Sequence, residues 1–349
     1  MHKIFNVMLS RDLGGIQQSF LDYNNIIAKA GFEPISITST NAKILPQILC
    51  KNYVLPNYCS FDLFSKYKLR KIIIEENPKL VIAHGKRAIT FTHSASKFLP
   101  QKTIIIGVAH NYWIKPLFLC DYVFSITTNL RNYLIDNGYD REKIFIMPNT
   151  INISSLPNDK LREKFSAKKV IIGTLARFVH KKGIDVLIKA ASILNSKKIE
   201  FEIRIGGDNG EELEKIKKLI RNLNLQDKVQ FLGWITNKEK FFNDIDIFCL
   251  PSRQEPFGII ILEAMLNRTP IISTKSEGPI EILSSNEAVL VDIDSAEQIA
   301  NGIIFLKNNV STAVKLSNKA FLRVTENYSI KNSAINLKTH IKTILSNDL

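Results

Sequence analysis

Two carboxylates in the second half of the chain have residue types and a spacing suited to binding a polyhydroxylated ligand. Glu255 ends a loop after the apolar run IDIFCLPS, and Glu263 lies eight residues later in an otherwise apolar helical stretch. Eight residues are a little over two helical turns, so a helix beginning near Phe257 would present its N-terminal amides and Glu263 on neighbouring faces. Carboxylates accept paired hydrogen bonds from vicinal hydroxyls. A charged residue that only kept the surface soluble would not be expected within this apolar stretch, so Glu263 needs another explanation.

Two cations precede these carboxylates in a pattern suited to binding an anion. Arg177 follows the buried-strand run KVIIGTL, and Lys182 lies five residues later, just before a predicted helix from Gly183. At such a strand-to-helix connection both charges can converge on one anion. An arginine fork and a lysine suit a diphosphate, whose negative charge must be neutralised as it leaves a sugar carbon. Solvated loop charges are the alternative.

Small residues open the first predicted helix. Gly14 and Gly15 follow the first strand, where backbone N–H groups could approach a phosphate at the helix N-terminus. Tight packing explains two glycines at this turn equally well. Their spacing is not the G-x-G-x-x-G dinucleotide fingerprint, so the sequence does not indicate NAD binding.

Two histidines end predicted strands of the first half. His110 stands in GVAHNYW and His84 in VIAHGKR. A histidine satisfied in the core or in a loop is one interpretation of His110. His84, with Lys86 and Arg87 beside it, could line a ligand site, and a structural role fits it equally well.

The elements that must position these residues alternate between short apolar runs and longer helical patterns. That alternation is typical of βαβ units and a parallel sheet. In the first half, strands are predicted over 3–9, 33–40, 79–85 and 102–110, with a helix over 15–31. In the second half, strands are predicted over 169–178, 200–207, 228–234, 245–252 and 269–275, with helices over 182–197, 211–225, 257–268 and from about 295 to the end.

A break between the two series predicts the domain boundary. Residues 146–159 carry two prolines and several asparagines and lead into a Lys/Glu-rich stretch. With 349 residues, the chain is long enough for two domains with separate cores. We predict an α/β protein with an N-terminal domain over 1–158 and a C-terminal domain over 159–327.

These motifs in combination carry a family resemblance. The E-x₇-E pattern with its E-P-F-G start, preceded by R-x₄-K-G, resembles the family-4 (group 1) retaining glycosyltransferases with the GT-B fold. The glycines at 14–15, P-N-T at 148–150 and G-P-I-E at 278–281 match in order, so the resemblance covers nearly the whole chain. Thr150 and Glu277 stand where the family often has glycine. The resemblance implies two Rossmann-like doubly wound domains facing a central cleft, with a C-terminal helix, about 328–349, packing back on the first.

The resemblance also implies roles for the candidate residues of the second half. Glu263 would hold the ribose hydroxyls of a nucleotide. Glu255, with the amides of Phe257, Gly258 and Ile259, would hold the transferred sugar. Arg177 and Lys182 would take the diphosphate.

Four further residues receive roles from the same resemblance. Gly14 and Gly15 would close on the phosphates, and His110 would approach the donor sugar and the bond being broken. The backbone of Trp234 and Ile235 would meet the nucleobase, whereas the Trp234 side chain could equally belong to the core.

The implied activity is retaining transfer of a hexose from a nucleotide diphosphate sugar to a hydroxyl of a glycan or glycolipid acceptor. Cell-envelope polysaccharide or lipopolysaccharide synthesis is the expected setting. No cofactor or metal is expected, because Arg177 and Lys182 would neutralise the leaving group. Domain closure around the donor would exclude water, with hinge movement near 150–165 and near the C-terminal helix.

The net charge of +14 indicates an anionic partner. Residues 1–150 hold 18 Lys and Arg against 10 Asp and Glu. A basic acceptor-side domain favours a membrane-associated acceptor and an anionic membrane surface as partners, whereas a solvated lysine-rich surface is the alternative. No long apolar run is present, so we expect a cytoplasmic protein, peripheral on the inner face of the cytoplasmic membrane at most.

Two function classes compete with an enzyme. A nucleic-acid-binding protein would share the charge, but basic residues are not interleaved with stacking aromatics, so no nucleic-acid partner is expected. A non-catalytic GT-B nucleotide-sugar-binding protein should have lost one of Glu255, Glu263, Arg177 or Lys182, and all four are present.

Overall fold

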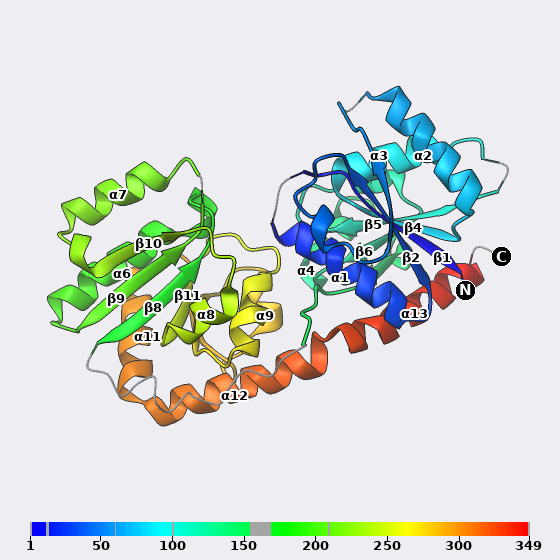
Figure 1. Cartoon of the computed structure of the whole chain (residues 1–349). Coiled ribbons are helices and arrows are strands. Elements are labelled where there is room, and N and C mark those ends of the chain that lie inside the picture. The colour runs from blue at the N-terminus through cyan, green and yellow to red at the C-terminus, as the bar shows by residue number, and fades with distance from the viewer. Residues whose placement is uncertain are drawn as a thin grey trace. The chain divides into compact units, whose positions relative to one another are not determined.

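The chain folds into two compact units (Figure 1). The computed structural model describes residues 2–11, 14–59, 61–99, 101–153, 169–208 and 210–347. Unit 1 comprises Met1–Asn152 with Tyr328–Leu349, and unit 2 comprises Ile153–Asn327. Residues 154–165 of the predicted linker and hinge lie outside the described residues.

Unit 1 is built on a seven-stranded parallel sheet in the order β3-β2-β1-β4-β5-β6-β7. Its central strands are apolar and buried on both faces, as parallel sheets covered by helices require. The strands are β1 (Lys3–Met8), β2 (Glu33–Ser39), β3 (Lys51–Leu55), β4 (Leu80–His84), β5 (Ile104–Ala109), β6 (Tyr122–Ser125) and β7 (Ile144–Ile146).

The helices of unit 1 are α1 (Gly15–Lys29), α2 (Leu63–Glu76), α3 (Gly85–Ser96), α4 (Thr128–Asp136) and the last helix, α13 (Ile330–Asn347). Helix α13 packs against α1 through a buried stripe that includes Leu337 and Ile341. His340 on the same helix donates a hydrogen bond from Nε2 to the Ile146 carbonyl, 3.1 Å away. The end of the chain therefore belongs to unit 1.

Side-chain caps define where several helices begin. The Asp62 carboxylate accepts a hydrogen bond from the Ser65 amide at 2.9 Å and starts α2. The Thr127 hydroxyl accepts one from Leu130 N at 3.2 Å and starts α4. Each cap satisfies an amide that has no partner within the helix, so the helix starts at that residue.

Unit 2 has a six-stranded parallel sheet in the order β10-β9-β8-β11-β12-β13. Its strands are β8 (Val170–Leu175), β9 (Phe201–Gly206), β10 (Val229–Gly233), β11 (Ile247–Leu250), β12 (Ile271–Thr274) and β13 (Val289–Val291). Its helices are α6 (Ile184–Ser196), α7 (Leu213–Asn222), α8 (Lys238–Asn243), α9 (Ile259–Leu266), α10 (Pro279–Ile282), α11 (Ala296–Asn308) and α12 (Val310–Asn327).

Both sheets have the doubly wound strand order. The first strand of each lies centrally, with the second and third on one side and the fourth onward on the other. The direction of winding therefore reverses between β1 and β4 in unit 1 and between β8 and β11 in unit 2, and ligands of open parallel sheets bind at such switch points. The prediction of two Rossmann-like domains is confirmed. Among the residues described, no helix is both long enough and apolar enough to cross a bilayer.

Gly183 joins the end of the loop after β8 to α6 at a place where a side chain has no room. Its φ is +64°, and a Cβ there would lie 1.9 Å from the Pro251 carbonyl oxygen, which belongs to the loop after β11. The absence of a side chain at Gly183 thus allows the two loops at the switch point of unit 2 to touch.

We expect Gly183→Ala to lower the free energy of unfolding of unit 2 by at least about 2 kcal/mol, because it adds a steric clash to the strain of a left-handed alanine. Gly233→Ala is the matched control: its φ is +66° and nothing lies within 4 Å of the added Cβ. It should cost only the conformational strain, about 1 kcal/mol. Equal losses in urea unfolding would contradict the packing argument.

Candidate functional site

A basic turn follows β8 at the carboxyl edge of the unit 2 sheet. Arg177 is exposed there, and the single turn His180–Lys182 precedes α6. Burial lowers the pKa of Lys181, and the neighbouring charges of Lys182 and Arg177 lower it further. Three cations therefore lie close enough for their charges to repel, an arrangement that favours an anionic ligand.

Glu255 lies against this basic turn. Lys182 Nζ is 2.5 Å from Glu255 Oε2, and the side chains keep only 16% and 11% of their exposure. Lys182 follows β8 and Glu255 follows β11, the two strands that flank the switch point. The structure thus brings together Arg177, Lys182 and Glu255, three of the four residues predicted to be catalytic.

Helix α9 begins at Ile259, two residues later than predicted. Gly258 precedes it with φ +95°, a left-handed conformation that ends the loop and leaves the first amides of α9 without intrahelical partners. The segment at Gly278 holds the loop at Phe257 in place, because Gly278 N donates a hydrogen bond of 2.8 Å to the Glu255 carbonyl. A Cβ on Gly278 would lie 2.5 Å from Phe257 N, so only glycine permits this approach.

Glu263 of α9 is partly buried, its side chain keeps 12% of its exposure, and one of its oxygens is paired. Its Oε1 is 2.5 Å from Lys238 Nζ, which comes from α8. Its Oε2 is buried and has no hydrogen-bond partner among the described residues. Burial raises the pKa of Glu263, and Lys238 opposes that shift. A buried oxygen without a partner costs about 1 to 3 kcal/mol, which is the signature of a group that awaits a donor.

Trp234 and Ile235 follow β10 at the same edge of the sheet. Trp234 keeps 50% of its exposure, so its side chain does not belong to the core. Ile235 packs against the end of β9, where a Cβ on Gly206 would come within 2.6 Å of it.

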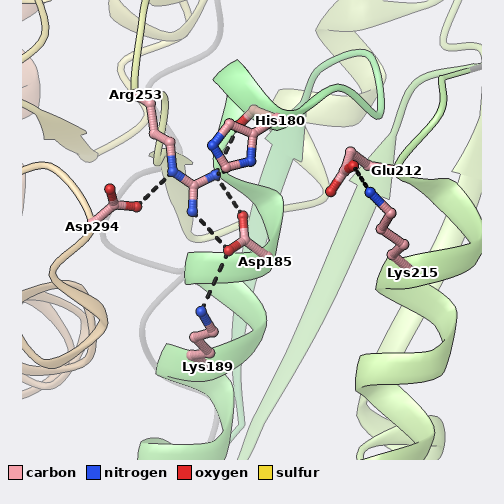
Figure 2. Close-up of polar contacts among 7 residues, drawn as sticks. All are labelled: His180, Asp185, Lys189, Glu212, Lys215, Arg253 and Asp294. Carbon is pink, nitrogen blue, oxygen red and sulfur yellow. Dashed lines mark hydrogen bonds and ion pairs between the residues drawn. The ribbon is translucent and has the colours of Figure 1, made fainter.

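Arg253 joins the basic turn to the Glu255 loop, and the sequence analysis missed it. Its guanidinium forms a two-point pair with Asp185 at 2.8 and 2.7 Å and donates to the His180 carbonyl at 2.7 Å. Its Nε donates to Asp294 at 2.6 Å (Figure 2). Its backbone N–H donates to the Lys181 carbonyl at 2.8 Å. Arg253 therefore fixes the segment that carries Lys182 relative to the segment that carries Glu255.

In unit 1, His84 and His110 share a hydrogen bond. His84 Nδ1 and His110 Nε2 are 2.9 Å apart at the ends of β4 and β5. His84 is buried, with Tyr23 packed edge-on at 4.9 Å between ring centroids. Burial lowers the pKa of His110 to about 3, and burial together with His110 lowers the pKa of His84 well below its usual range. Both rings are neutral at physiological pH.

A pocket beside His110 holds further predicted residues of unit 1. It is lined by residues that include Ile16, Gly85, Lys86, His110 and Trp113. Lys86 Nζ lies 5.1 Å from the centre of the Trp113 ring. Arg87 points elsewhere and donates a hydrogen bond to Asn57 Oδ1 at 3.3 Å.

The predicted glycines lie at the start of α1. Gly14 is its N-cap, with an extended φ of 167°, and Gly15 is its first residue. A Cβ on Gly14 would lie 3.1 Å from Gln17 Oε1, a flexible neighbour that can move. The phosphate role of both glycines stays a prediction.

Comparison with known proteins agrees with this architecture. Residues 157–323 match the family model of glycosyl transferases group 1. The matched segment, which makes up most of unit 2, belongs to the group 1 glycosyltransferase family. The resemblance stated from the sequence motifs is thereby confirmed, and so is the GT-B fold class.

Individual proteins similar to this chain include a poly(ribitol-phosphate) α-N-acetylglucosaminyltransferase of Staphylococcus aureus. It is 26% identical over 80% of this chain and 59% of its own length. A lipopolysaccharide core biosynthesis glycosyltransferase of Rhizobium meliloti is 31% identical over 52% of this chain and 53% of its own length. The matches thus span little more than half of these two relatives.

Among solved structures, Anabaena HepE in complex with UDP and glucose has a TM-score of 0.83. The two chains are 18% identical, and the superposition covers 99% of this chain and 100% of that one. At this identity the likeness shows the shared fold.

The neutral histidine pair predicts a pH-dependent stability of unit 1. Below about pH 6.5 the two histidines bind protons in the unfolded chain but not in the folded one, because their folded pKa values are lower. The free energy of unfolding is therefore highest above that pH and falls as the solution becomes more acidic. The limiting slope is about 1.4 kcal/mol per pH unit for each histidine. Urea unfolding from pH 7.5 to 5, followed through Trp113, measures it.

The double variant His84→Gln/His110→Asn should show a shallower slope than the wild type. His2→Gln, which removes an exposed histidine, is its control and should leave the slope unchanged. A wild-type stability that stays flat to pH 5 would contradict the neutral pair.

Arg253→Lys should destabilise unit 2 by about 2 kcal/mol, because an ammonium cannot replace a fork that reaches two carboxylates and a carbonyl. The control is Lys189→Ala, which removes the exposed lysine 3.5 Å from the same Asp185 and should cost less than about 0.5 kcal/mol. Urea unfolding followed through Trp234 in a Trp113→Phe background isolates unit 2. A smaller loss in Arg253→Lys than in the control would refute the assignment.

Proposed function

We propose that this group 1 glycosyltransferase is a retaining hexosyltransferase. It takes a hexose from a nucleotide diphosphate sugar and joins it to a hydroxyl of a glycan or glycolipid acceptor in cell-envelope polysaccharide or lipopolysaccharide synthesis. The observation that carries this proposal is the pair of largely covered carboxylates, Glu255 in the loop before α9 and Glu263 in the second turn of α9. Each is paired with one lysine, and the basic turn lies beside the first.

The two ion pairs support a donor site in which the ligand replaces each lysine. Hydroxyls of the transferred sugar would donate to Glu255, freeing Lys182 to join Arg177 on the diphosphate. Ribose hydroxyls would donate to Glu263, whose Oε2 has no hydrogen-bond partner among the residues described. The amides of Phe257, Gly258 and Ile259 would add donors to the sugar, and the backbone of Trp234 and Ile235 would meet the base.

In the proposed reaction the acceptor oxygen bonds to the anomeric carbon on the face from which the diphosphate leaves. The carbon–oxygen bond to the diphosphate breaks, and a diphosphate oxygen takes the acceptor proton. Arg177 and Lys182 neutralise the leaving group, so we propose that neither metal nor cofactor takes part. His110, neutral at physiological pH, acts as a hydrogen-bond partner of the donor sugar, and the amides at Gly14 and Gly15 contact its phosphates.

The relatives support the choice of substrates. HepE was crystallised with UDP and glucose, and the two relatives carry names that place them in lipopolysaccharide core synthesis and in transfer to poly(ribitol-phosphate). We propose a cytoplasmic site of action beside an anionic membrane surface, where acceptors of these classes are built.

A thermal-shift panel of UDP-, GDP-, ADP- and TDP-sugars tests the donor site. The cognate donor at a hundredfold its Kd should stabilise the wild type by about 2.7 kcal/mol. Glu263→Gln should lose most of that shift, because an amide accepts through one oxygen only and cannot bind two hydroxyls as a carboxylate does. Glu239→Gln, at an exposed position next to Lys238, is the control and should keep it.

No shift with any donor, or an equal shift in both variants, would reject the donor site. With the donor identified, NMR of the product should show the anomeric configuration of the donor at a rate that EDTA leaves unchanged. An inverted product would reject retention, and inhibition by EDTA would reject metal independence, while each would leave the donor site standing.

A further inference from the structure

Helix α2 of unit 1 is apolar on two opposite faces. Its inner face packs Leu69, Ile72 and Ile73 into the core. Its outer face presents Leu63 and Tyr67, four residues apart on one stripe, which keep 76% and 57% of their exposure. A helix at the surface of a soluble domain normally places polar residues on the outer face, so the second apolar face needs a separate explanation.

The exposed aromatic surface extends beyond the helix on both sides. Phe64, on the first turn of α2, is 63% exposed, and Tyr58 and Phe61, in the segment before it, are 78% and 84% exposed. Asp62 ties that segment to the helix, because its carboxylate accepts hydrogen bonds from Tyr58 N and Ser65 N, both at 2.9 Å. We call the surface formed by Tyr58, Phe61, Leu63, Phe64, Tyr67 and Phe98 the aromatic face.

Phe98 is held outward by a strained backbone. It is 94% exposed and has a φ of +56°, a left-handed conformation that bulky side chains rarely adopt. Arg70 of α2 stabilises this conformation by donating hydrogen bonds to the Phe98 carbonyl at 2.9 Å and to the Ala95 carbonyl at 3.2 Å. A contact from α2 thus holds a backbone conformation in which the Phe98 ring stays in solvent, and packing of unit 1 alone does not require that exposure.

The charges around the aromatic face are mainly positive. Lys68, Lys71 and Lys97 are exposed beside it, and Lys71 Nζ lies 5.0 Å from the centre of the Tyr67 ring. Two of the nearby carboxylates are used internally: Asp62 caps α2, and Glu76 is buried between Lys3 and Lys51 at 2.8 and 2.6 Å. The electrostatic potential outside the aromatic face is thus set by several exposed lysines that lie among the aromatic rings.

This combination selects one occupant. In a symmetric dimer the face would meet itself, and its lysines would be brought against lysines. An anionic bilayer satisfies both features, because rings enter the interface below the headgroups and lysines pair with lipid phosphates. We propose that the aromatic face docks unit 1 on an anionic phospholipid bilayer. Docking itself does not depend on the proposed function. Only its purpose rests on that function: docking would bring the enzyme to a lipid-linked acceptor.

Co-sedimentation of the full chain with vesicles tests the proposal. Phosphatidylcholine vesicles with about 30 mol% phosphatidylglycerol should bind the wild type, and pure phosphatidylcholine should bind it at least tenfold more weakly. Phe61→Ser/Phe64→Ser should weaken binding to the anionic vesicles at least tenfold. The matched control is Leu322→Ser/Ile335→Ser, which removes two exposed apolar side chains elsewhere and should bind as the wild type does.

Equal partitioning of the two double variants would overturn the aromatic face as the docking surface. Sedimentation equilibrium without lipid supplies the other decisive outcome: a dimer that Phe61→Ser/Phe64→Ser abolishes would assign the face to a second copy of the chain and overturn the proposal. The donor-induced thermal shift is measured on every variant. Its retention by Phe61→Ser/Phe64→Ser separates loss of membrane binding from failure of the donor site.

Discussion

The ion pair between Lys182 and Glu255 joins the loops after β8 and β11, the two strands that flank the switch point of unit 2. Two other contacts hold those loops together. Gly183 lets the backbone reach the Pro251 carbonyl, and Arg253 binds both Asp185 and the His180 carbonyl. The pair costs desolvation of two charges, so its persistence in the fold depends on this backbone support. The backbone contacts between the loops therefore position the site, and the charged side chains depend on them.

Much of this arrangement follows from the sequence. Strand–helix alternation predicts two doubly wound sheets, and such sheets bring the residues after their strands to one edge, which places Arg177 and Glu255 near each other. The start of α9 was predicted two residues early, because the apolar run after Phe257 gives no signal that Gly258 adopts a left-handed conformation. The exposure of Trp234 was left open for a similar reason, since an aromatic after a strand fits core and surface alike.

Partners of charged residues could not be predicted. The pairing of Glu263 with Lys238 joins two elements 25 residues apart, and nothing in either local pattern specifies it. Arg253 lies two residues before Glu255, and Asp185 directly follows the predicted helix start at Gly183 and Ile184, but their meeting depends on the crossing of two loops. The aromatic face was hidden for another reason. Nothing in the sequence separates the apolar residues of α2 that the fold buries, such as Leu69 and Ile72, from those that it leaves exposed, such as Phe64.

The candidate residues of the two units differ in electrostatic character, and each would have a separate task in the proposed transfer reaction. Unit 2 keeps cations beside Glu255 and Glu263, so in the proposed reaction it would compensate a diphosphate that gains charge as it leaves. In unit 1 the His84–His110 pair is neutral, because burial lowers both pKa values far below physiological pH. If His110 has the role proposed for it, a charged imidazolium would compete with the basic turn for the diphosphate. A neutral ring could instead share a hydrogen bond with a sugar hydroxyl without competing for the phosphates. Under the proposed function, the burial that keeps the pair neutral would therefore serve the reaction as well as the packing of unit 1.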